Sequence, residues 1–228
     1  MAPSVQHRKR HFDEMCRPKD DKTAVFRNYQ EAKETERNDW MISYQITEWC
    51  HRMAEAHIAP GDLCIDATMG NGYDTQFLCE RVGEDGRVLA FDIQQAALEQ
   101  TEKRLKEALD YRNYELYLES HEQMSRYAEE GSVSCILFNL GYLPGGDHGL
   151  ATKAESTLRA MESSLRLLKR GGVMSVCIYS GGDSGFEERD QVLAWLKDLD
   201  SRRFLVLVTE YYNRPQNPPI PVLVVKVK

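Results

Sequence analysis

Short apolar runs alternate along most of the chain with longer segments in which apolar residues recur every three or four positions. Five runs have the length of buried strands, at 62–66, 87–91, 114–118, 133–138 and 173–179. Five segments have the period of helices, at 73–82, 94–109, 121–128, 151–169 and 186–199. Strands that alternate with helices form parallel β-α-β units, so the pattern predicts an α/β fold with a doubly wound, Rossmann-like sheet.

The end of the chain breaks this alternation. Two further apolar runs, 204–211 and 221–227, are joined by a loop rich in Pro and Asn at 212–220, and no helical segment lies between them. Strands that lack a crossover helix pair most easily antiparallel. We therefore expect a seven-stranded sheet whose last strand is antiparallel.

The beginning of the chain differs from the rest. Residues 1–37 hold nine Lys or Arg and seven Asp or Glu among few apolar residues, which predicts a charged N-terminal extension of mostly irregular structure. An amphipathic helix is expected between Trp40 and Met53, and Pro60-Gly61 ends it. We expect two parts, the extension 1–37 and one α/β domain at 38–228.

Composition narrows the class of protein. The chain has 228 residues, 42% of them hydrophobic and 29% charged, so it can bury a core without disulfides or metal. No apolar run approaches the roughly 18 residues that span a membrane, and residues 1–10 are polar and basic, unlike a secretory signal, so a cytoplasmic protein is expected. None of the six cysteines forms a C-x-x-C pair, which favours buried small side chains over metal ligands.

Charge is spread unevenly along the chain. The net charge of −7 combines +2 for residues 1–37 with −9 for residues 38–228, which hold twenty Lys or Arg against twenty-nine Asp or Glu. An acidic body does not indicate nucleic-acid binding, but phosphate contacts need only a local basic patch. Candidate basic residues for such contacts lie at 8–10, 202–203 and 214.

Candidate chemistry lies in the loops that follow the strands, where doubly wound sheets bind ligands. The first loop, 66–75, contains two glycines that let the backbone approach a ligand, but Thr75 stands where a dinucleotide fingerprint has its third glycine. Asp66 and Asp74 flank this turn, and carboxylates suit a cation better than a pyrophosphate. The sulfonium and ammonium groups of S-adenosylmethionine fit this loop better than NAD does.

The next two loops offer contacts to a nucleoside. Asp92 ends the second strand and is placed to hydrogen-bond ribose hydroxyls, which holds for NAD as well as for S-adenosylmethionine; alternatively it caps the following helix. Polar residues at 119–122 follow the third strand and can reach an adenine edge. For His121, an ordinary place at a helix start remains equally open.

The fourth loop, 139–148, resembles the N-P-P-Y loop of amino-methyltransferases, with other residues in place of the two prolines. The side-chain oxygen of Asn139 can accept hydrogen bonds from a target amine, and Tyr142 can stack on a flat base. Asp147, His148 or water can take the proton that the amine must lose. The catalytic candidates are Asn139, Tyr142 and Asp147.

Several runs resemble one bacterial family in the right order. Residues 66–75, 91–94 and 138–147, with the loop 213–219, are similar to the family first described as rRNA methylases and now associated with tRNA 5-aminomethyl-2-thiouridine methyltransferase (MnmM). The resemblance covers roughly residues 40–228. It implies a class I S-adenosylmethionine methyltransferase fold, and as acceptor the aminomethyl nitrogen of the wobble uridine in the tRNA anticodon stem-loop. The product would be 5-methylaminomethyl-2-thiouridine.

The resemblance and the loops together give the expected site. The cofactor-binding candidates are Asp66, Thr68, Gly70, Asn71, Gly72, Asp74, Asp92, Ile93, Gln94, Ser120, His121 and Asn139. Tyr142 and Asp147 would face the acceptor. The sequence departs from the family at Gly182, where the family usually has His. Fold alone does not fix a substrate, so a methyltransferase of the same fold that acts on rRNA or a small molecule remains the alternative.

Overall fold

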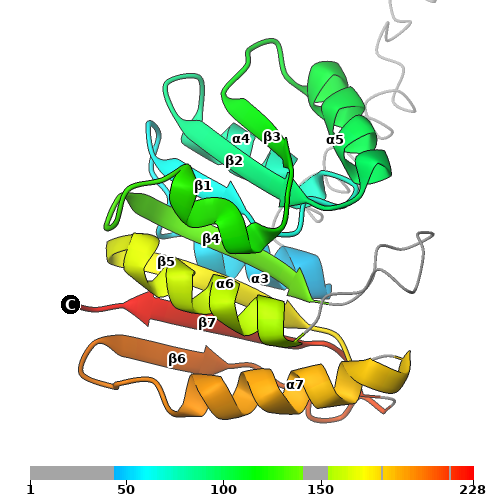
Figure 1. Cartoon of the computed structure of the whole chain (residues 1–228), viewed down its shortest axis with the longest axis vertical. Coiled ribbons are helices and arrows are strands. Elements are labelled where there is room, and N and C mark those ends of the chain that lie inside the picture. The colour runs from blue at the N-terminus through cyan, green and yellow to red at the C-terminus, as the bar shows by residue number, and fades with distance from the viewer. Residues whose placement is uncertain (1–43, 141–153, 181, 216) are drawn as a thin grey trace, which may run out of the picture. The chain divides into compact units, whose positions relative to one another are not determined.

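The computed structural model describes residues 44–140, 154–180, 182–215 and 217–228, which contain one seven-stranded sheet (Figure 1). The elements in chain order are α3 (Ile46–Glu55), β1 (Leu63–Asp66), α4 (Tyr73–Val82), β2 (Arg87–Asp92), α5 (Gln95–Ala108), β3 (Tyr114–Leu118), the 3-10 helix η1 (His121–Arg126), β4 (Val133–Leu140), α6 (Ala154–Leu167), β5 (Leu168–Ile178), α7 (Gly182–Lys197), β6 (Phe204–Val208) and β7 (Ile220–Lys226).

The sheet has the strand order β3-β2-β1-β4-β5-β7-β6. The pairs among β1 to β5 are parallel, whereas β7 is inserted antiparallel between β5 and β6. The predicted seven-stranded sheet with an antiparallel last strand is therefore confirmed. The cause is the helix-free connection after β6, which leaves β7 free to return beside its neighbour in the opposite direction.

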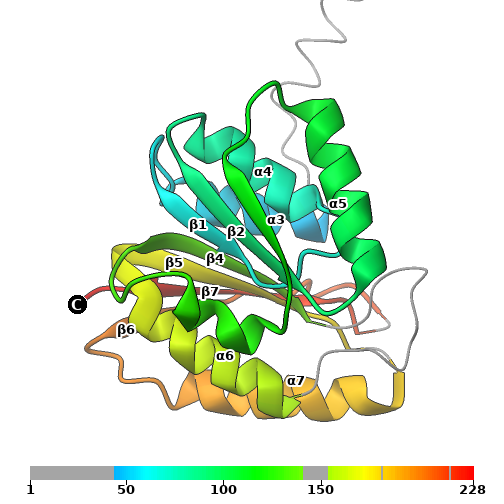
Figure 2. The ribbon, with the colours of Figure 1, turned by 45° about the horizontal axis from the view of Figure 1, so that its top comes forward.

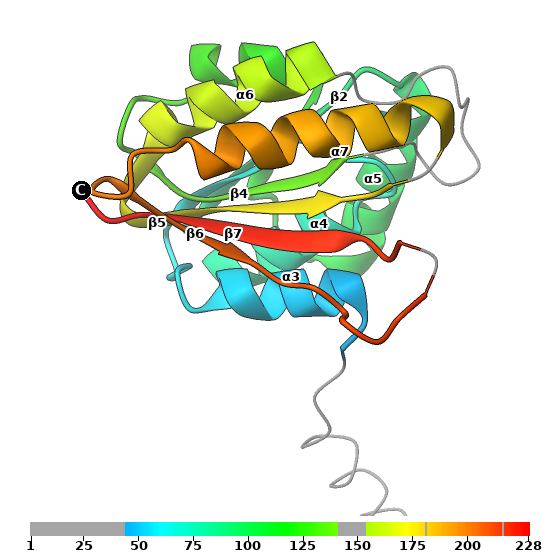
Figure 3. The same cartoon turned by 90° about the horizontal axis from the view of Figure 1, so that it is seen from below.

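Helices cover both faces of the sheet, which makes three layers (Figure 3). The helices α3, α4 and α5 pack on one face, and η1, α6 and α7 pack on the other (Figures 2 and 3). Each face of the sheet has its own apolar core, and successive residues of a strand belong to the two cores alternately. Cys64 and Val88 point to the first face, whereas Ile65 and Leu89 point to the second. This period of two explains why both apolar cores come from near-continuous apolar runs.

Several boundaries differ from those that the pattern predicts. Strand β5 begins at Leu168 rather than at residue 173, and it carries Gly171 and Gly172 within it. A Cβ at Gly172 would lie 2.9 Å from the backbone oxygen of Val133, so the close pairing of β5 with β4 needs a glycine there. The segment expected as a helix at 121–128 is a 3-10 helix of six residues.

Five cysteines lie in the described part of the chain. Cys50, Cys64, Cys79, Cys135 and Cys177 are all buried and none is in a disulfide. Burial raises the pKa of the Cys135 thiol well above its usual value, which keeps the thiol neutral. These side chains therefore pack as small hydrophobic groups. Across the described ranges, no helix is long and apolar enough to cross a membrane.

Candidate active site at the carboxyl edge of the sheet

The carboxyl ends of β1 to β5 meet at one edge, and the chain reverses its direction of strand addition at β1. Helices leave β1 and β4 toward opposite faces of the sheet, which opens this edge at the point where doubly wound folds bind ligands. The expected cofactor residues follow β1, β2, β3 and β4, and the topology brings them together here.

The glycine turn after β1 has the backbone that its sequence predicts. Gly70 and Gly72 have φ angles of 51° and 78°, in the left-handed region that favours glycine. The Thr101 hydroxyl of α5 donates to the Gly70 carbonyl at 3.1 Å, and Arg104 donates to the Asn71 carbonyl at 2.8 Å. Two side chains of α5 thus hold the carbonyl groups of the turn, which fixes the conformation of its backbone.

Asp66 lies beneath this turn and is fully buried. Its carboxylate accepts hydrogen bonds from the Thr75 hydroxyl at 2.6 Å and from the Thr68 backbone N–H at 3.1 Å. Burial raises the pKa of Asp66 to about 7, and the nearby negative charge of Asp74 adds to the rise. These bonds suit Asp66 to holding the turn in shape; a direct contact with a cofactor remains a prediction.

Asp92 ends β2 and joins two segments of the site. One carboxylate oxygen accepts from the Gly70 N–H and the other from the Gln94 N–H, both at 2.9 Å. The second bond closes a turn just before α5, whose N-cap residue is Gln94, so Asp92 is not the N-cap of that helix; the first bond ties β2 to the glycine turn. Each oxygen keeps a lone pair, which is what a ribose hydroxyl needs. Ile93 next to it is 55% exposed and offers an apolar surface at the same place.

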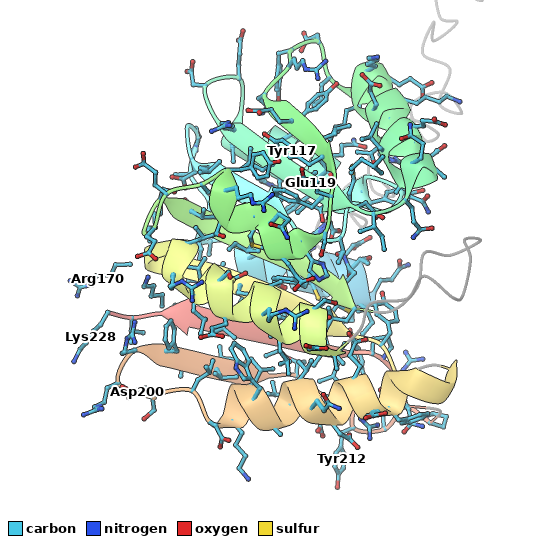
Figure 4. All side chains as sticks on the ribbon, in the orientation of Figure 1. Tyr117, Glu119, Arg170, Asp200, Tyr212 and Lys228 are labelled. Atoms are coloured by element: carbon cyan, nitrogen blue, oxygen red, sulfur yellow. The ribbon has the colours of Figure 1, made fainter. Side chains whose placement is uncertain are left out.

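Two polar atoms at the end of β3 are buried without a partner in the described structure. They are Oε2 of Glu119 and Nε2 of His121 (Figure 4 labels Glu119). The other ring nitrogen of His121 lies 3.2 Å from the Ala67 carbonyl and must donate to it, so Nε2 is an acceptor. Burial lowers the pKa of His121, which keeps this ring neutral. Two orphaned acceptors fit the exocyclic amine of adenine, which carries two N–H donors.

Ser120 lies between Glu119 and His121 in the sequence and has a structural role. Its hydroxyl accepts from the Glu122 backbone N–H at 3.3 Å and caps η1. This contact orients η1 and with it His121. A contact of Ser120 with the cofactor stays a prediction.

Asn139 near the end of β4 sits against the glycine turn. Its side-chain Nδ2 donates to Asp74 at 2.6 Å, and its backbone N–H donates to the Thr68 hydroxyl at 2.7 Å. The other oxygen of Asp74 lies 2.7 Å from Nε2 of His51 on α3. Sequence reasoning missed His51, because its pattern indicates only a position on an amphipathic helix. Tyr142 and Asp147 lie outside the described residues.

The edge carries negative charge and no metal-like cluster. Asp66 ends β1, Asp74 lies in the first turn of α4 and Asp92 ends β2. In the described part of the chain, no three His, Cys, Asp or Glu side chains gather as a metal site would need. Such an arrangement suits a cation that brings its own positive charge. The residues present therefore fit the adenosine, ribose and charged groups of S-adenosylmethionine.

The basic candidates do not all lie near this edge. Phe204 begins β6 opposite Lys226, so Arg202 and Arg203 lie at the amino edge, where Arg202 pairs with Asp200 (Figure 4 labels Asp200). Arg214 follows β6 at the carboxyl edge, in the loop that returns to β7. Residues 202–203 and Arg214 therefore lie at opposite ends of β6, and contacts of either with RNA phosphates stay a prediction.

The chain resembles known methyltransferases over this whole domain. Residues 88–225 match the family model described as "Putative rRNA methylase". The chain is 37% identical over 183 residues to the tRNA (mnm(5)s(2)U34)-methyltransferase, chloroplastic, of Arabidopsis thaliana, an alignment that covers 76% of this chain and 67% of that protein.

Two solved structures extend the resemblance to three dimensions. A "putative rRNA-methylase" from Clostridium thermocellum has 40% identity and a TM-score of 0.77, with 82% of this chain and all of that chain covered. SMU.1697c, a "putative methyltransferase" from Streptococcus mutans in complex with SAH, has 34% identity and a TM-score of 0.73, with 82% and 99% covered. Both alignments cover 82% of this chain.

Proposed function

This chain belongs to the rRNA methylase family, and from this premise we propose that it is an S-adenosylmethionine-dependent tRNA methyltransferase. The reaction is methylation of the 5-aminomethyl nitrogen of 5-aminomethyl-2-thiouridine at the wobble position, which gives 5-methylaminomethyl-2-thiouridine. The observation that carries the proposal is the Asn139 amide, held by Asp74 beside the glycine turn. An amide so placed can bind an amine at the point where a methyl donor is held.

In this proposal, different residues bind different parts of the cofactor. Asp92 is placed to bind the ribose, and His121 and Glu119 supply acceptors for the adenine amine. The cofactor brings a methyl group on a positively charged sulfur, which the acceptor nitrogen takes in one in-line displacement. The amine nitrogen forms the new N–C bond as the C–S bond breaks, and the sulfur keeps the electron pair.

Asn139 has two tasks toward the acceptor. Its Oδ1 accepts an N–H bond of the amine, which aims the nitrogen lone pair, and its position near the glycine turn places that lone pair beside the methyl group. Correct alignment of two reactants supplies much of the acceleration in such a reaction. The amine must be neutral to attack, and the methylated product then gives up one proton to water or to a base, for which Asp147 and His148 are the candidates from the sequence.

We propose that RNA approaches across the loop between β6 and β7. A pocket of about 480 Å³ lies there, lined by Tyr44, Gln45, Ile46, Tyr211, Arg214, Pro215 and Pro218. The Tyr211 hydroxyl donates to the Tyr44 carbonyl at 2.6 Å, and Tyr212 is 98% exposed (Figure 4). Exposed aromatic rings beside an arginine are the usual platform for unstacked bases.

Nucleoside mass spectrometry tests the reaction. Total tRNA from a strain that lacks this methylation is incubated with the protein and S-adenosylmethionine, then digested. Conversion of the aminomethyl nucleoside to its N-methyl form supports the proposal, and an Asn139→Ala variant that binds the cofactor but gives no product is the matched control. If the protein binds the cofactor but converts no tRNA nucleoside, its acceptor is another molecule. Because the family name suggests rRNA, rRNA is tested in parallel with tRNA.

The compartment is proposed on the sequence alone. We propose a cytoplasmic location, whereas the Arabidopsis relative is named as chloroplastic. Fractionation of cells that express the full chain tests this placement.

A further inference from the structure

Three side chains from separate elements form a continuous chain of hydrogen bonds at the candidate site. Nε2 of His51 on α3 lies 2.7 Å from Oδ1 of Asp74, and Oδ2 of Asp74 accepts from Nδ2 of Asn139 at 2.6 Å. The His51 and Asp74 side chains are 20% and 12% exposed, so solvent competes little for these bonds. His51 is the outer end of this chain, and Asn139 is the inner end.

Asp74 decides which way the Asn139 amide faces. An ionised carboxylate only accepts hydrogen bonds, so the atom of Asn139 that lies against it must be the amino group and not the oxygen. The amide oxygen then points to the other side. A rotation of the amide by half a turn would place two oxygens against each other and present an N–H donor to the acceptor amine, which also donates.

His51 in turn is fixed by two contacts from α4. Its ring stacks on Phe77 with a centroid distance of 3.9 Å and an interplanar angle of 2°, and its Nε2 reaches Asp74 one turn earlier on the same helix. The stack sets the plane of the imidazole, and the plane directs the N–H to Oδ1. With Oδ1 held toward His51, Oδ2 faces Asn139 and accepts from its amide.

We propose that His51 is a positioning residue for methyl transfer, acting through Asp74 to keep the amide oxygen of Asn139 turned toward the acceptor amine. The inference rests on the proposed function, in which Asn139 binds that amine. It assigns a role to a helix that precedes the cofactor loops and supplies none of the expected cofactor residues. His51 itself touches neither the acceptor nor the cofactor in this arrangement.

Two substitutions separate the hydrogen bond from the ring stack. His51→Gln keeps an N–H donor near the position of Nε2 but loses the ring, whereas His51→Phe keeps the ring on Phe77 but loses the donor. Positioning predicts that H51F lowers kcat by about 10- to 100-fold, the range expected when a reacting group is misplaced. H51Q keeps most of the rate. Affinity for S-adenosylmethionine, measured by calorimetry, changes by less than about threefold in either variant.

His57→Phe is the matched control. His57 lies just after α3, and its ring bonds the Gly171 carbonyl at 3.0 Å instead of a residue of the candidate site. Its kcat should equal that of the wild type. Asp74→Asn gives an independent variant, since an amide no longer dictates which end of Asn139 faces it. The double variant H51F/D74N should lose no more rate than the worse single variant, as expected of residues that act in one chain.

The outcomes are distinct. No product from the wild-type protein refutes the proposed function and not the hydrogen-bond chain. Product from the wild type with equal kcat for H51F overturns the positioning role. A reversed order, in which H51F is active and H51Q is not, would show that the ring stack matters instead. A loss of cofactor affinity or melting temperature with unchanged kcat would make the pair a structural link between α3 and α4.

Discussion

Gly72 shows what the glycine turn demands of its neighbours. Its φ of 78° lies in the left-handed region, and a Cβ built there would lie 2.7 Å from Oγ1 and 2.9 Å from Cγ2 of Thr101. Gly83 at the end of α4 has a similar φ of 68°, yet a Cβ there would meet nothing within 4 Å. The two glycines therefore separate the cost of backbone strain from the cost of a collision.

The magnitudes follow from these contacts. Alanine in the left-handed conformation costs about 1–2 kcal/mol, which is the whole expected loss for Gly83→Ala. Gly72→Ala adds about 1–3 kcal/mol of overpacking, because Thr101 is fully buried and its Cα lies only 3.0 Å from the new methyl group. We expect a loss of about 2–5 kcal/mol for G72A, with each kcal/mol lowering the melting temperature by about 2–4 °C in a domain of this size.

Urea unfolding followed by circular dichroism measures the stability of both variants, and calorimetric titration with S-adenosylmethionine measures their cofactor affinity. G72A should lose affinity as well as stability, since Thr101 also bonds the Gly70 carbonyl, whereas G83A should keep its affinity. Thr101→Ala in the G72A background removes the two side-chain atoms of the collision but leaves the Thr101 Cα, so it should restore part of the stability. Equal losses for G72A and G83A would refute the reasoning that α5 lies too close for any side chain.

Three further predictions concern the carboxylates and the adenine end of the site. Asp92→Ala removes the acceptor of two backbone N–H groups and of the ribose, so calorimetry should show affinity for S-adenosylmethionine at least about tenfold weaker; unchanged affinity would reject the ribose assignment. Because the pKa of Asp66 is raised in the folded state, protonation of Asp66 stabilises the fold; this contribution is complete below about pH 3.8 and is lost as the pH rises toward 7. Asp66→Asn should abolish this pH dependence of the unfolding free energy, measured by denaturant titration at several pH values. A wild-type dependence on pH that is no steeper than that of D66N contradicts the assignment. His121→Phe should weaken cofactor binding several-fold and, because the Ala67 carbonyl loses its donor, lower the unfolding free energy by about 1–3 kcal/mol; equal affinity would place the adenine elsewhere.

The number of strands and most of their bounds could be predicted because buried parallel strands are short apolar runs with helices between them, whereas their order in the sheet comes from the structure. The antiparallel insertion of β7 followed from one local fact, the helix-free loop after β6. The start of β5 could not be predicted in this way. Gly171 and Gly172 signal a helix end in sequence, but both lie within β5, and the closeness of Gly172 to the backbone of β4 is a tertiary contact.

The candidate site shows the same division. Asp92 and the glycine turn were predictable because their place in a β-α unit fixes their position. The link between His51 and Asp74 was not, since 23 residues separate them and the apolar pattern of α3 carries no information on which residue of α4 a polar side chain meets. Likewise, the opposed positions of Arg202 and Arg214 appear only once β6 has a direction in the sheet.

Thr75 explains why the turn selects a cation even though it resembles a dinucleotide fingerprint. In that fingerprint the third glycine lets helix and strand pack closely. Here the position carries a buried hydroxyl that donates to Asp66, so the space is used to keep a carboxylate beneath the turn. Asp74 adds a second negative charge in the first turn of α4, where it offsets the helix dipole that would otherwise attract a phosphate. A pyrophosphate would meet repulsion from the Asp74 carboxylate, whereas a sulfonium or ammonium would be attracted to it. In the proposed reaction the same Asp74 orients the Asn139 amide for the amine.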